Sequence, residues 1–207
     1  MKIAVLGATR GIGLEVVKAA LAEGHEVTGL ARHPERMPIE DARLWLVKGD
    51  AQDAQIVAQV VEGQDVVCDC LGTTQLKGEV RLFSRSAENL ARTLRPEQLL
   101  IAVTGIGAGE SRGHGGFFYD RVLRPLFLRQ MYEDKERQEK IIRERIARWI
   151  VVRPGFLTNG PRTGRYRVLT DLRGVQAGKI SRADVADFIL SQVKDPRYLG
   201  QSPLLTY

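Results

Sequence analysis

Short apolar segments alternate with segments of helical periodicity along most of the chain. KIAVL, residues 2–6, is a continuous apolar run, which is typical of a strand buried on both faces of a parallel sheet. Residues 14–24, LEVVKAALAEG, follow with apolar side chains at helical spacing and a terminal glycine. Because strands that alternate with helices pack as a parallel sheet between two helical layers, the sequence predicts a doubly wound α/β fold.

No linker or internal repeat divides the chain, so we expect one domain over residues 1–207, with a small C-terminal region on the substrate side. Residues 181–193 are predicted to form a helix that opens with a capping-box-like arrangement of Ser181 and Asp184. The further predicted strands are 26–32, 43–50, 65–74, 98–105, 148–155 and 203–207, and the further helices are 54–63, 80–94 and 132–146.

Composition narrows the class of protein. No apolar run reaches the roughly 18 residues of a membrane span, and the N-terminus lacks the layout of a signal peptide. We therefore expect a cytoplasmic protein. Cys68 and Cys70 would point to the same face of a strand and are poorly placed to bridge each other. With no histidine or further cysteine nearby, they predict buried small side chains and no metal site.

The chain is basic, with a formal charge of +6. Between residues 153 and 182 stand seven basic residues and one acidic residue. Such an excess suits an anionic ligand and is equally compatible with a solvated surface. No aromatic-interleaved basic motif or zinc-finger spacing is present, so we expect neither nucleic acid nor a membrane as partner. A small-molecule substrate and a monomer or small homo-oligomer are expected.

The stretch GATRGIG, residues 7–13, connects the first predicted strand to the first predicted helix. Backbone N–H groups at such a helix N-terminus attract a pyrophosphate, and glycine is needed where a Cβ would block its approach. An ordinary turn is the alternative. The strand before the loop and the helix after it favour a phosphate-binding loop. Its predicted cofactor contacts are Gly7, Thr9, Arg10, Gly11, Ile12 and Gly13.

The end of the second predicted strand indicates which cofactor is bound. An acidic residue there would bind a ribose 2′-hydroxyl, whereas arginine accommodates a 2′-phosphate. This chain has Arg32 and His33 at that point and no acid until Glu35, while Arg10 offers a second guanidinium. These residues predict NADP(H).

Taken together, several segments resemble the short-chain dehydrogenase/reductase superfamily over nearly the whole chain. The resemblance is greatest to its atypical NAD(P)-binding members, such as the biliverdin reductase B (flavin reductase) type and the NmrA-like group, and implies a Rossmann fold. It is carried by GATRGIGLEVV, LARHPERM, VKGDAQD, DVVCDCLGTT, AVTGIGAG, YEDKERQEKIIRE, WIVVRPGFLTNGPRTGRYRV and ISRADVADFIL.

The resemblance implies further cofactor contacts. Asp50 with Ala51 would meet the adenine, and Lys135 would bind the nicotinamide ribose hydroxyls. Helical spacing places Lys135 on the same face as Ile142 and Ile146, turned toward the sheet; a lysine snorkelling at the helix start is the alternative. The remaining implied contacts are Leu71, Gly72 and Thr73 beside the adenine ribose, Val103 and Thr104 beside the nicotinamide ribose, and Pro154, Gly155, Phe156 and Leu157 at the carboxamide.

The catalytic pattern departs from the superfamily's Ser and Tyr-x-x-x-Lys. Met131 stands four residues before Lys135, and Tyr132 only three, rotated about 100° from the required place on a helix. Ser111 lies along a glycine-rich loop, and Gly105 and Phe156 occupy the biliverdin reductase-like Ser and His positions. The candidate catalytic residues are Lys135, Tyr132 and Thr104.

Two hypotheses follow. The first is an NADP-dependent oxidoreductase that transfers hydride from NADPH to a planar or anionic acceptor such as a flavin or quinone, because positioning supplies much of the acceleration in such reactions. The second is a non-catalytic NADP-binding redox sensor that acts through a protein partner. Epimerase or dehydratase chemistry is disfavoured, because the chain after Arg153 is short for a substrate domain. An aromatic platform for the acceptor, or plain core packing, is predicted at Phe117, Phe118, Tyr119 and Phe156.

Overall fold

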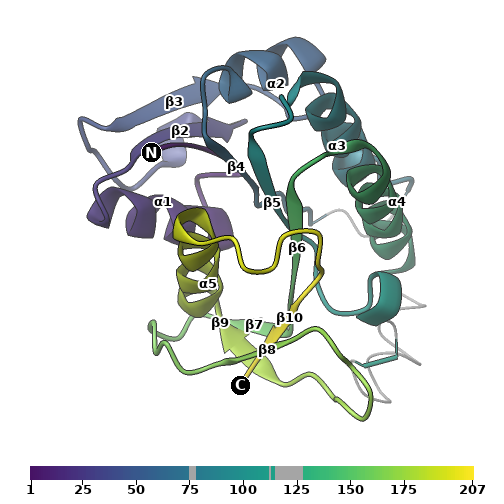
Figure 1. Ribbon diagram of the computed structural model, residues 1–207. Coiled ribbons are helices and arrows are strands. Elements are labelled where there is room, and N and C mark those ends of the chain that lie inside the picture. The colour runs from purple at the N-terminus through teal and green to yellow at the C-terminus, as the bar shows by residue number, and fades with distance from the viewer. Residues whose placement is uncertain (75–77, 112, 115–127) are drawn as a thin grey trace.

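The computed structural model describes residues 1–74, 78–111, 113–114 and 128–207. Its main feature is an eight-stranded sheet with the order β3-β2-β1-β4-β5-β6-β10-β8 (Figure 1). All neighbouring strands in it are parallel except β8, which runs antiparallel to β10. The strands are β1 Lys2–Leu6, β2 Glu26–Ala31, β3 Leu44–Lys48, β4 Val66–Asp69, β5 Leu99–Val103, β6 Trp149–Pro154, β8 Arg167–Leu169 and β10 Leu204–Thr206.

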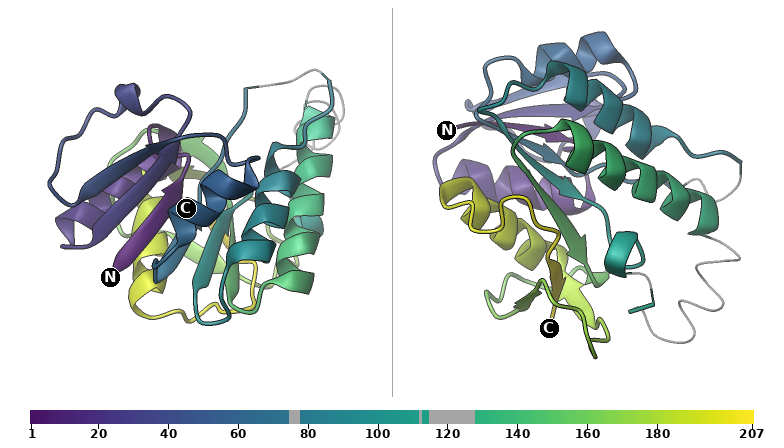
Figure 2. Two further views of the ribbon diagram at one scale, coloured as in Figure 1. Left: turned by 90° about the horizontal axis from the view of Figure 1, so that it is seen from above. Right: turned by 45° about the vertical axis from the view of Figure 1, so that its right-hand side comes forward.

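The predicted doubly wound fold is confirmed. Helices cover both faces of the sheet, α1 and α5 on one side and α2, α3 and α4 on the other (Figure 2). A small separate sheet pairs β7 with β9 in parallel next to the carboxyl end of β6. The helices are α1 Gly11–Ala22, α2 Ala54–Val61, α3 Leu82–Thr93, α4 Arg129–Arg145 and α5 Arg182–Lys194, with 3-10 turns η1 Pro34–Arg36 and η2 Gly109–Ser111; the small sheet is β7 Phe156–Thr158 and β9 Lys179–Ser181.

The first strand shows why both layers form. Ile3 and Val5 belong to the core cluster under α1 and α5, whereas Ala4 and Leu6 belong to the cluster under α2, α3 and α4. Successive side chains of a strand point to opposite faces, so a continuous apolar run supplies both cores. All four are completely buried.

The observed elements differ most from the predicted ones at the margins of the sheet. The strand predicted at 43–50 covers only Leu44–Lys48. Trp45 in it is 50 % exposed, because β3 is an edge strand. The helix predicted at 132–146 begins at Arg129, and η1 follows β2 where no helix was predicted. Within the described part of the chain, no helix is long and apolar enough to cross a membrane.

Candidate cofactor site

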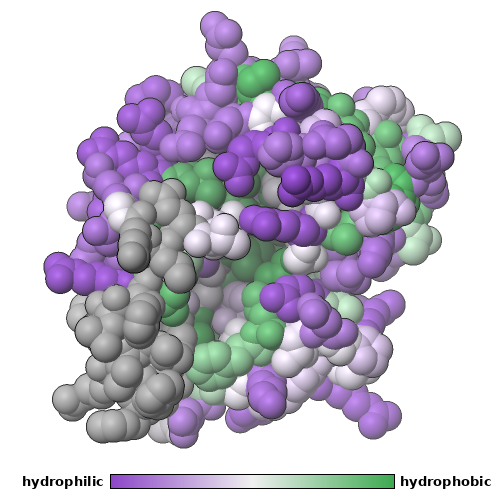
Figure 3. Space-filling model, turned by 180° about the vertical axis from the view of Figure 1, so that it is seen from behind, coloured by the Kyte–Doolittle hydropathy of each residue, from purple (hydrophilic) through white to green (hydrophobic). Residues whose placement is uncertain are grey.

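A cleft with a volume of ≈ 1230 Å³ lies at the carboxyl ends of the parallel strands, where ligands bind in doubly wound sheets. It extends from the end of β2, past the loop between β1 and α1, to the segment after β6 and the start of α5. Figure 3 shows the molecule from behind, where the surface is hollowed and apolar residues gather in the hollow. The size is ample for a dinucleotide.

The glycine loop forms one wall of this cleft. Gly7 has a φ of 83° and Gly11 one of 62°, both in the left-handed region that glycine tolerates. A Cβ on Gly13 would lie 2.2 Å from the carbonyl oxygen of Gly7, so Gly13 lets α1 pack against the end of β1. Among the described residues, a Cβ on Gly11 would have only Arg182 within 4 Å, with Nε at 3.9 Å. The loop is therefore open to the cleft at Gly11 and packed against protein at Gly13.

The first turn of α1 presents its backbone N–H groups to this opening. No side chain caps them among the residues that the structure describes, and the turn contains no acidic residue. Three other helices are capped: Asp53 caps α2, Ser181 caps α5, and Asp134 of α4 accepts hydrogen bonds from the N–H groups of Phe83 (2.8 Å) and Ser84 (3.3 Å) in α3. The positive end of α1 is thus available to an anion such as a phosphate.

Basic side chains line the end of the cleft near β2. Arg10, Arg32, His33 and Arg36 all line it, and all but His33 lack a side-chain hydrogen bond or ion pair within the described ranges. The His33 ring lies 3.0 Å from a carboxylate oxygen of Glu35. The one acid of this segment is therefore engaged by His33, and the three guanidinium groups remain for an anion.

The loops after β3 and β4 form the opposite wall at this end. Asp50 lines the cleft, and its Oδ1 accepts a hydrogen bond of 2.9 Å from the backbone N–H of Gln52. Leu71, Gly72 and Thr73 line it as well, and a Cβ on Gly72 would have no atom of the described residues within 4 Å. This wall is open enough for a flat group to approach its backbone.

Asp69, the last residue of β4, ties this wall to the helices behind it. Its carboxylate accepts hydrogen bonds from Leu71 N (3.3 Å), Gln138 Nε2 (3.0 Å) and Ser86 Oγ (3.4 Å). Burial raises the pKa of Asp69 to about 6, although these bonds and the charge of Lys135 act in the opposite direction. Asp69 thus couples the loop after β4 to α3 and α4.

Lys135 points inward from α4, as its spacing with Ile142 predicts, and is 9 % exposed. Its Nζ donates a hydrogen bond to the carbonyl oxygen of Thr104 at the end of β5. Burial lowers the pKa of Lys135 to about 8, while the charges of Glu139 and Asp69 raise it. The ammonium lines the cleft beside the end of β5, where it can bind hydroxyl groups.

Behind Lys135 lies a buried ion pair. Glu139 accepts hydrogen bonds from Arg153 at 3.1 Å and 2.6 Å, and both side chains are almost wholly buried. The Thr104 hydroxyl donates to Glu139 over 2.8 Å. Gly109 covers the pair, since a Cβ there would lie 2.4 Å from the Arg153 guanidinium. Thr104 therefore directs its hydroxyl proton to Glu139, and its carbonyl to Lys135.

The other hydroxyls near Lys135 do not line the cleft. Tyr132 is 6 % exposed and packs with Ile106, and its hydroxyl would lie 3.5 Å from a Cβ on Gly105. Ser111 is completely buried and donates to the carbonyl oxygen of Ala108 over 2.6 Å. Met131 does line the cleft. The described wall beside Lys135 thus carries a thioether where the superfamily carries a tyrosine.

The pattern of the NAD(P)H-binding family matches residues 7–196. The chain belongs to this family. Among curated relatives, an isoflavone reductase homologue of Zea mays is 33 % identical over 102 residues, which are 44 % of this chain and 33 % of that protein. The chain spans a third or less of the first curated relatives it matches.

Solved structures of low sequence identity share the fold over the whole chain. The anaerobillin reductase ChuY of Escherichia coli O157:H7 is 22 % identical, with a TM-score of 0.82 over 100 % of this chain and 97 % of that chain. A Streptococcus pneumoniae protein with a proposed NADH-flavin reductase activity is 22 % identical, with a TM-score of 0.78 over 100 % and 99 %. A Veillonella parvula short-chain dehydrogenase/reductase in complex with NADP is 18 % identical, with a TM-score of 0.81 over 100 % and 94 %. These likenesses confirm the Rossmann-like fold that the resemblance implies.

Most residues that the sequence predicts for the cofactor lie together along the cleft of this NAD(P)H-binding protein. Gly13, Gly155, Phe156 and Tyr132 do not line it. A Cβ on Gly155 would lie 2.4 Å from the carbonyl oxygen of Gly178, so this glycine permits close packing against the chain before β9. The predicted platform residues 117–119 lie outside the described ranges. The predicted cofactor residues that do line the cleft are Gly7, Thr9, Arg10, Gly11, Ile12, Arg32, His33, Asp50, Ala51, Leu71, Gly72, Thr73, Val103, Thr104, Lys135, Pro154 and Leu157.

Sequence reasoning missed a set of residues that close the cleft from the C-terminal part of the chain. The basic excess of residues 153–182 and the cap at Ser181 were the available signals, because they place a charged helix start at the same sheet edge. Cys70, expected to be buried like Cys68, is only half-buried and lines the cleft. The missed residues of this part that figure below are Asn159, Arg162 and Arg182; Arg36 of η1 and Met131 of α4 also line the cleft, although the sequence did not assign them to the site.

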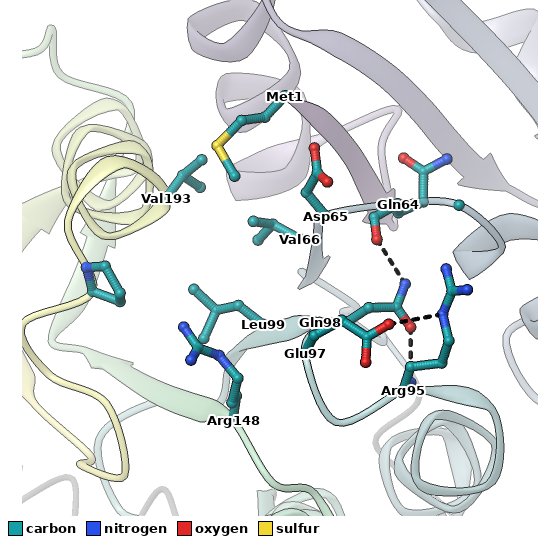
Figure 4. Close-up of a pocket in the computed structure, with 12 residues that line it drawn as sticks. Met1, Gln64, Asp65, Val66, Arg95, Glu97, Gln98, Leu99, Arg148 and Val193 are labelled. Carbon is teal, nitrogen blue, oxygen red and sulfur yellow. Dashed lines mark hydrogen bonds and ion pairs between the residues drawn. The ribbon is translucent and has the colours of Figure 1, made fainter.

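A second cavity of ≈ 460 Å³ lies at the opposite ends of the strands, around the start of β4 and β5 (Figure 4). Its polar groups largely serve the fold: Gln98 donates to the carbonyl oxygens of Val61 (2.9 Å) and Gln64 (2.7 Å), and Arg95 pairs with Glu97 at 3.3 Å. Its described lining does not include the first turns of α1 and α5, which do line the first cleft.

Proposed function

We propose that this member of the NAD(P)H-binding family is an NADP-dependent oxidoreductase that transfers hydride from NADPH to a planar or anionic acceptor, such as a flavin, a quinone or a linear tetrapyrrole. The observation that carries the proposal is the uncapped N-terminus of α1, which opens on a cleft lined with arginines. The V. parvula complex with NADP shares this fold and supports the choice of cofactor.

The side chains at the two ends of the cleft would bind different parts of the cofactor. Arg10, Arg32 and Arg36 would hold a 2′-phosphate at one end, and Asp50 would contact the adenine nearby. Lys135 would hold the nicotinamide ribose at the other end, beside the end of β5. When bound, NADPH supplies the hydride; the protein supplies orientation.

The acceptor is inferred from the groups around Lys135. Met131 cannot donate a proton, and the hydroxyls of Thr104 and Ser111 are bound to Glu139 and Ala108. An acceptor that needs stacking more than a positioned protein acid fits these walls. The anaerobillin reductase and the proposed NADH-flavin reductase of the same fold support this class.

Cofactor binding and turnover test the proposal. The purified protein should bind NADPH more tightly than NADH and should oxidise NADPH in the presence of a flavin, a quinone or a linear tetrapyrrole. Arg32→Ala should raise the Kd for NADPH roughly tenfold and leave that for NADH unchanged, because only NADPH carries the 2′-phosphate.

Arg95→Ala is the matched control, since it removes an arginine from the second cavity, far from the carboxyl ends of the strands. Equal affinity for both dinucleotides would contradict the assignment to NADP. Absence of turnover with all three acceptors, in a protein that binds NADPH, would contradict the reductase activity.

The second candidate is a non-catalytic NADP-binding module that signals to a partner protein. The observation that favours it is the replacement of the superfamily's tyrosine by Met131 in the cleft wall. Tight NADPH binding without turnover is its expected outcome, and turnover abolished by Lys135→Ala would exclude it.

A further inference from the structure

The start of α5 lies beside the start of α1 on the same edge of the sheet. The two helices contact each other, and Val16, Val17, Val185 and Ile189 belong to one core cluster. Ser181 caps α5 by accepting a hydrogen bond of 2.9 Å from the N–H of Asp184. This cap fixes where α5 begins, and therefore where its first residue stands relative to the glycine loop.

Arg182, that first residue, reaches the mouth of the glycine loop. Its Nε lies 3.9 Å from the position of a Cβ on Gly11. Its Nη1 donates a hydrogen bond of 2.7 Å to the side-chain oxygen of Asn159, and both residues line the cleft. The amide is neutral, so it orients the guanidinium without cancelling its charge.

The neighbouring charges are already compensated. Arg162 forms an ion pair of 2.6 Å with Asp187, and Glu15 forms one of 2.9 Å with Lys18. In the part of the chain that the structure describes, no carboxylate forms an ion pair with Arg182. A free, oriented guanidinium therefore stands next to the uncapped N–H groups of α1.

We infer that Arg182, held by Asn159, binds the pyrophosphate of the cofactor from the side opposite the glycine loop; this rests on the function proposed above. The guanidinium lies beside the first residue of α1, and the partial positive charge of a helix N-terminus and a guanidinium would reinforce each other on one phosphate. The C-terminal part of the chain thus contributes to cofactor affinity as well as to the acceptor side of the cleft.

Two fragments of the cofactor separate this role from others. 2′-Phospho-ADP-ribose contains the pyrophosphate, whereas adenosine 2′-monophosphate does not. Arg182→Ala should raise the Kd for NADPH and for 2′-phospho-ADP-ribose roughly tenfold or more, and leave the Kd for adenosine 2′-monophosphate unchanged. Arg182→Lys should recover part of the loss, and Asn159→Ala should produce a smaller loss of the same pattern.

Arg165→Ala is the matched control, because Arg165 is an exposed arginine of the same region that does not line the cleft. Unfolding curves of each variant identify a variant that has lost its fold, in which case Arg182→Lys and Asn159→Ala carry the test.

Unchanged Kd values for the pyrophosphate-containing ligands would overturn the inference. So would a raised KM for an anionic acceptor with unchanged cofactor affinity, which would assign Arg182 to the acceptor. If the wild-type protein binds NADPH but reduces no acceptor, the reductase proposal fails while these Kd comparisons still decide the role of Arg182.

Discussion

At the scale of single residues, the buried charges next to the cleft are the most consequential feature. The charges of Glu139 and Asp69 act on Lys135, and its Nζ lies 5.0 Å from the centroid of the Phe83 ring. Buried ionisable groups are retained at a cost in stability, and they concentrate at functional sites. Lys135 is therefore expected to weaken the fold and to strengthen the site.

Lys135→Met tests both expectations. Burial lowers the pKa of Lys135 from its ordinary value of 10.5 to about 8. Between these values the unfolded chain holds a proton that the folded protein has released, so the free energy of unfolding should rise with pH from about 8 to 10.5. The rise should amount to about 1–3 kcal/mol in the wild type. The methionine variant should lack it and should bind NADPH more weakly.

Urea unfolding at pH 7.5 and pH 10 would measure the effect, with Lys140→Met, on the exposed side of the same helix, as control. An equal rise in wild type and in Lys135→Met would show that another group is responsible.

At the scale of elements, the N-terminus of α3 depends on a residue far away in the sequence. Asp134 of α4 is completely buried, accepts from the first turn of α3 and pairs with Arg137 at 3.1 Å. The sequence predicts a helix at 80–94 from its periodicity, yet no local side chain caps it. Asp134 therefore joins two helices that form the walls around Lys135.

Asp134→Ala should lower the free energy of unfolding by about 2–3 kcal/mol, because it leaves buried N–H groups of α3 without their acceptor. Asp134→Asn, which keeps an acceptor oxygen, should lose less. Asp53→Ala removes an ordinary local cap from α2 and should cost about 1 kcal/mol. Urea unfolding compares the three, and a loss for Asp134→Ala no larger than that for Asp53→Ala would contradict a cross-helix role.

The same elements show what the sequence can and cannot predict. Local signals sufficed for the parallel strands of the main sheet, for Gly7 to Gly13 and for the inward face of Lys135, but did not place the short strands β7, β8 and β9. The insertion of β10 between β6 and β8 has no local signature. Nor has the approach of Arg182 to Gly11, which arises from helix packing between residues about 170 positions apart in the sequence.

At the scale of the whole molecule, the last residue links the C-terminal strand to the wall of the cleft. The Tyr207 hydroxyl donates to Asp184 over 2.7 Å and accepts from the N–H of Ser181 over 3.0 Å. Asp184 also accepts hydrogen bonds from Thr163 and Gly164, in the loop that follows Asn159. Burial acts to raise the pKa of Asp184, but the hydrogen bonds prevail and lower it. The carboxylate thus holds the C-terminus, the start of α5 and the cleft-side loop together.

Tyr207→Phe should therefore have two consequences. The free energy of unfolding at pH 7 should fall by about 1 kcal/mol, since a hydrogen bond to a charged, buried carboxylate is lost. The deficit should shrink as pH falls toward the pKa of Asp184, because a hydrogen bond to the charged form contributes only above that pKa. The Kd for NADPH should also rise, as the loop that carries Asn159 and orients Arg182 loses an anchor.

Arg167→Ala is the control. It removes a hydrogen bond of 2.8 Å to the Tyr207 carbonyl oxygen, leaves the hydroxyl in place and should leave the Kd unchanged. Lower stability with unchanged NADPH affinity in Tyr207→Phe would show that the C-terminus supports the fold without supporting the site.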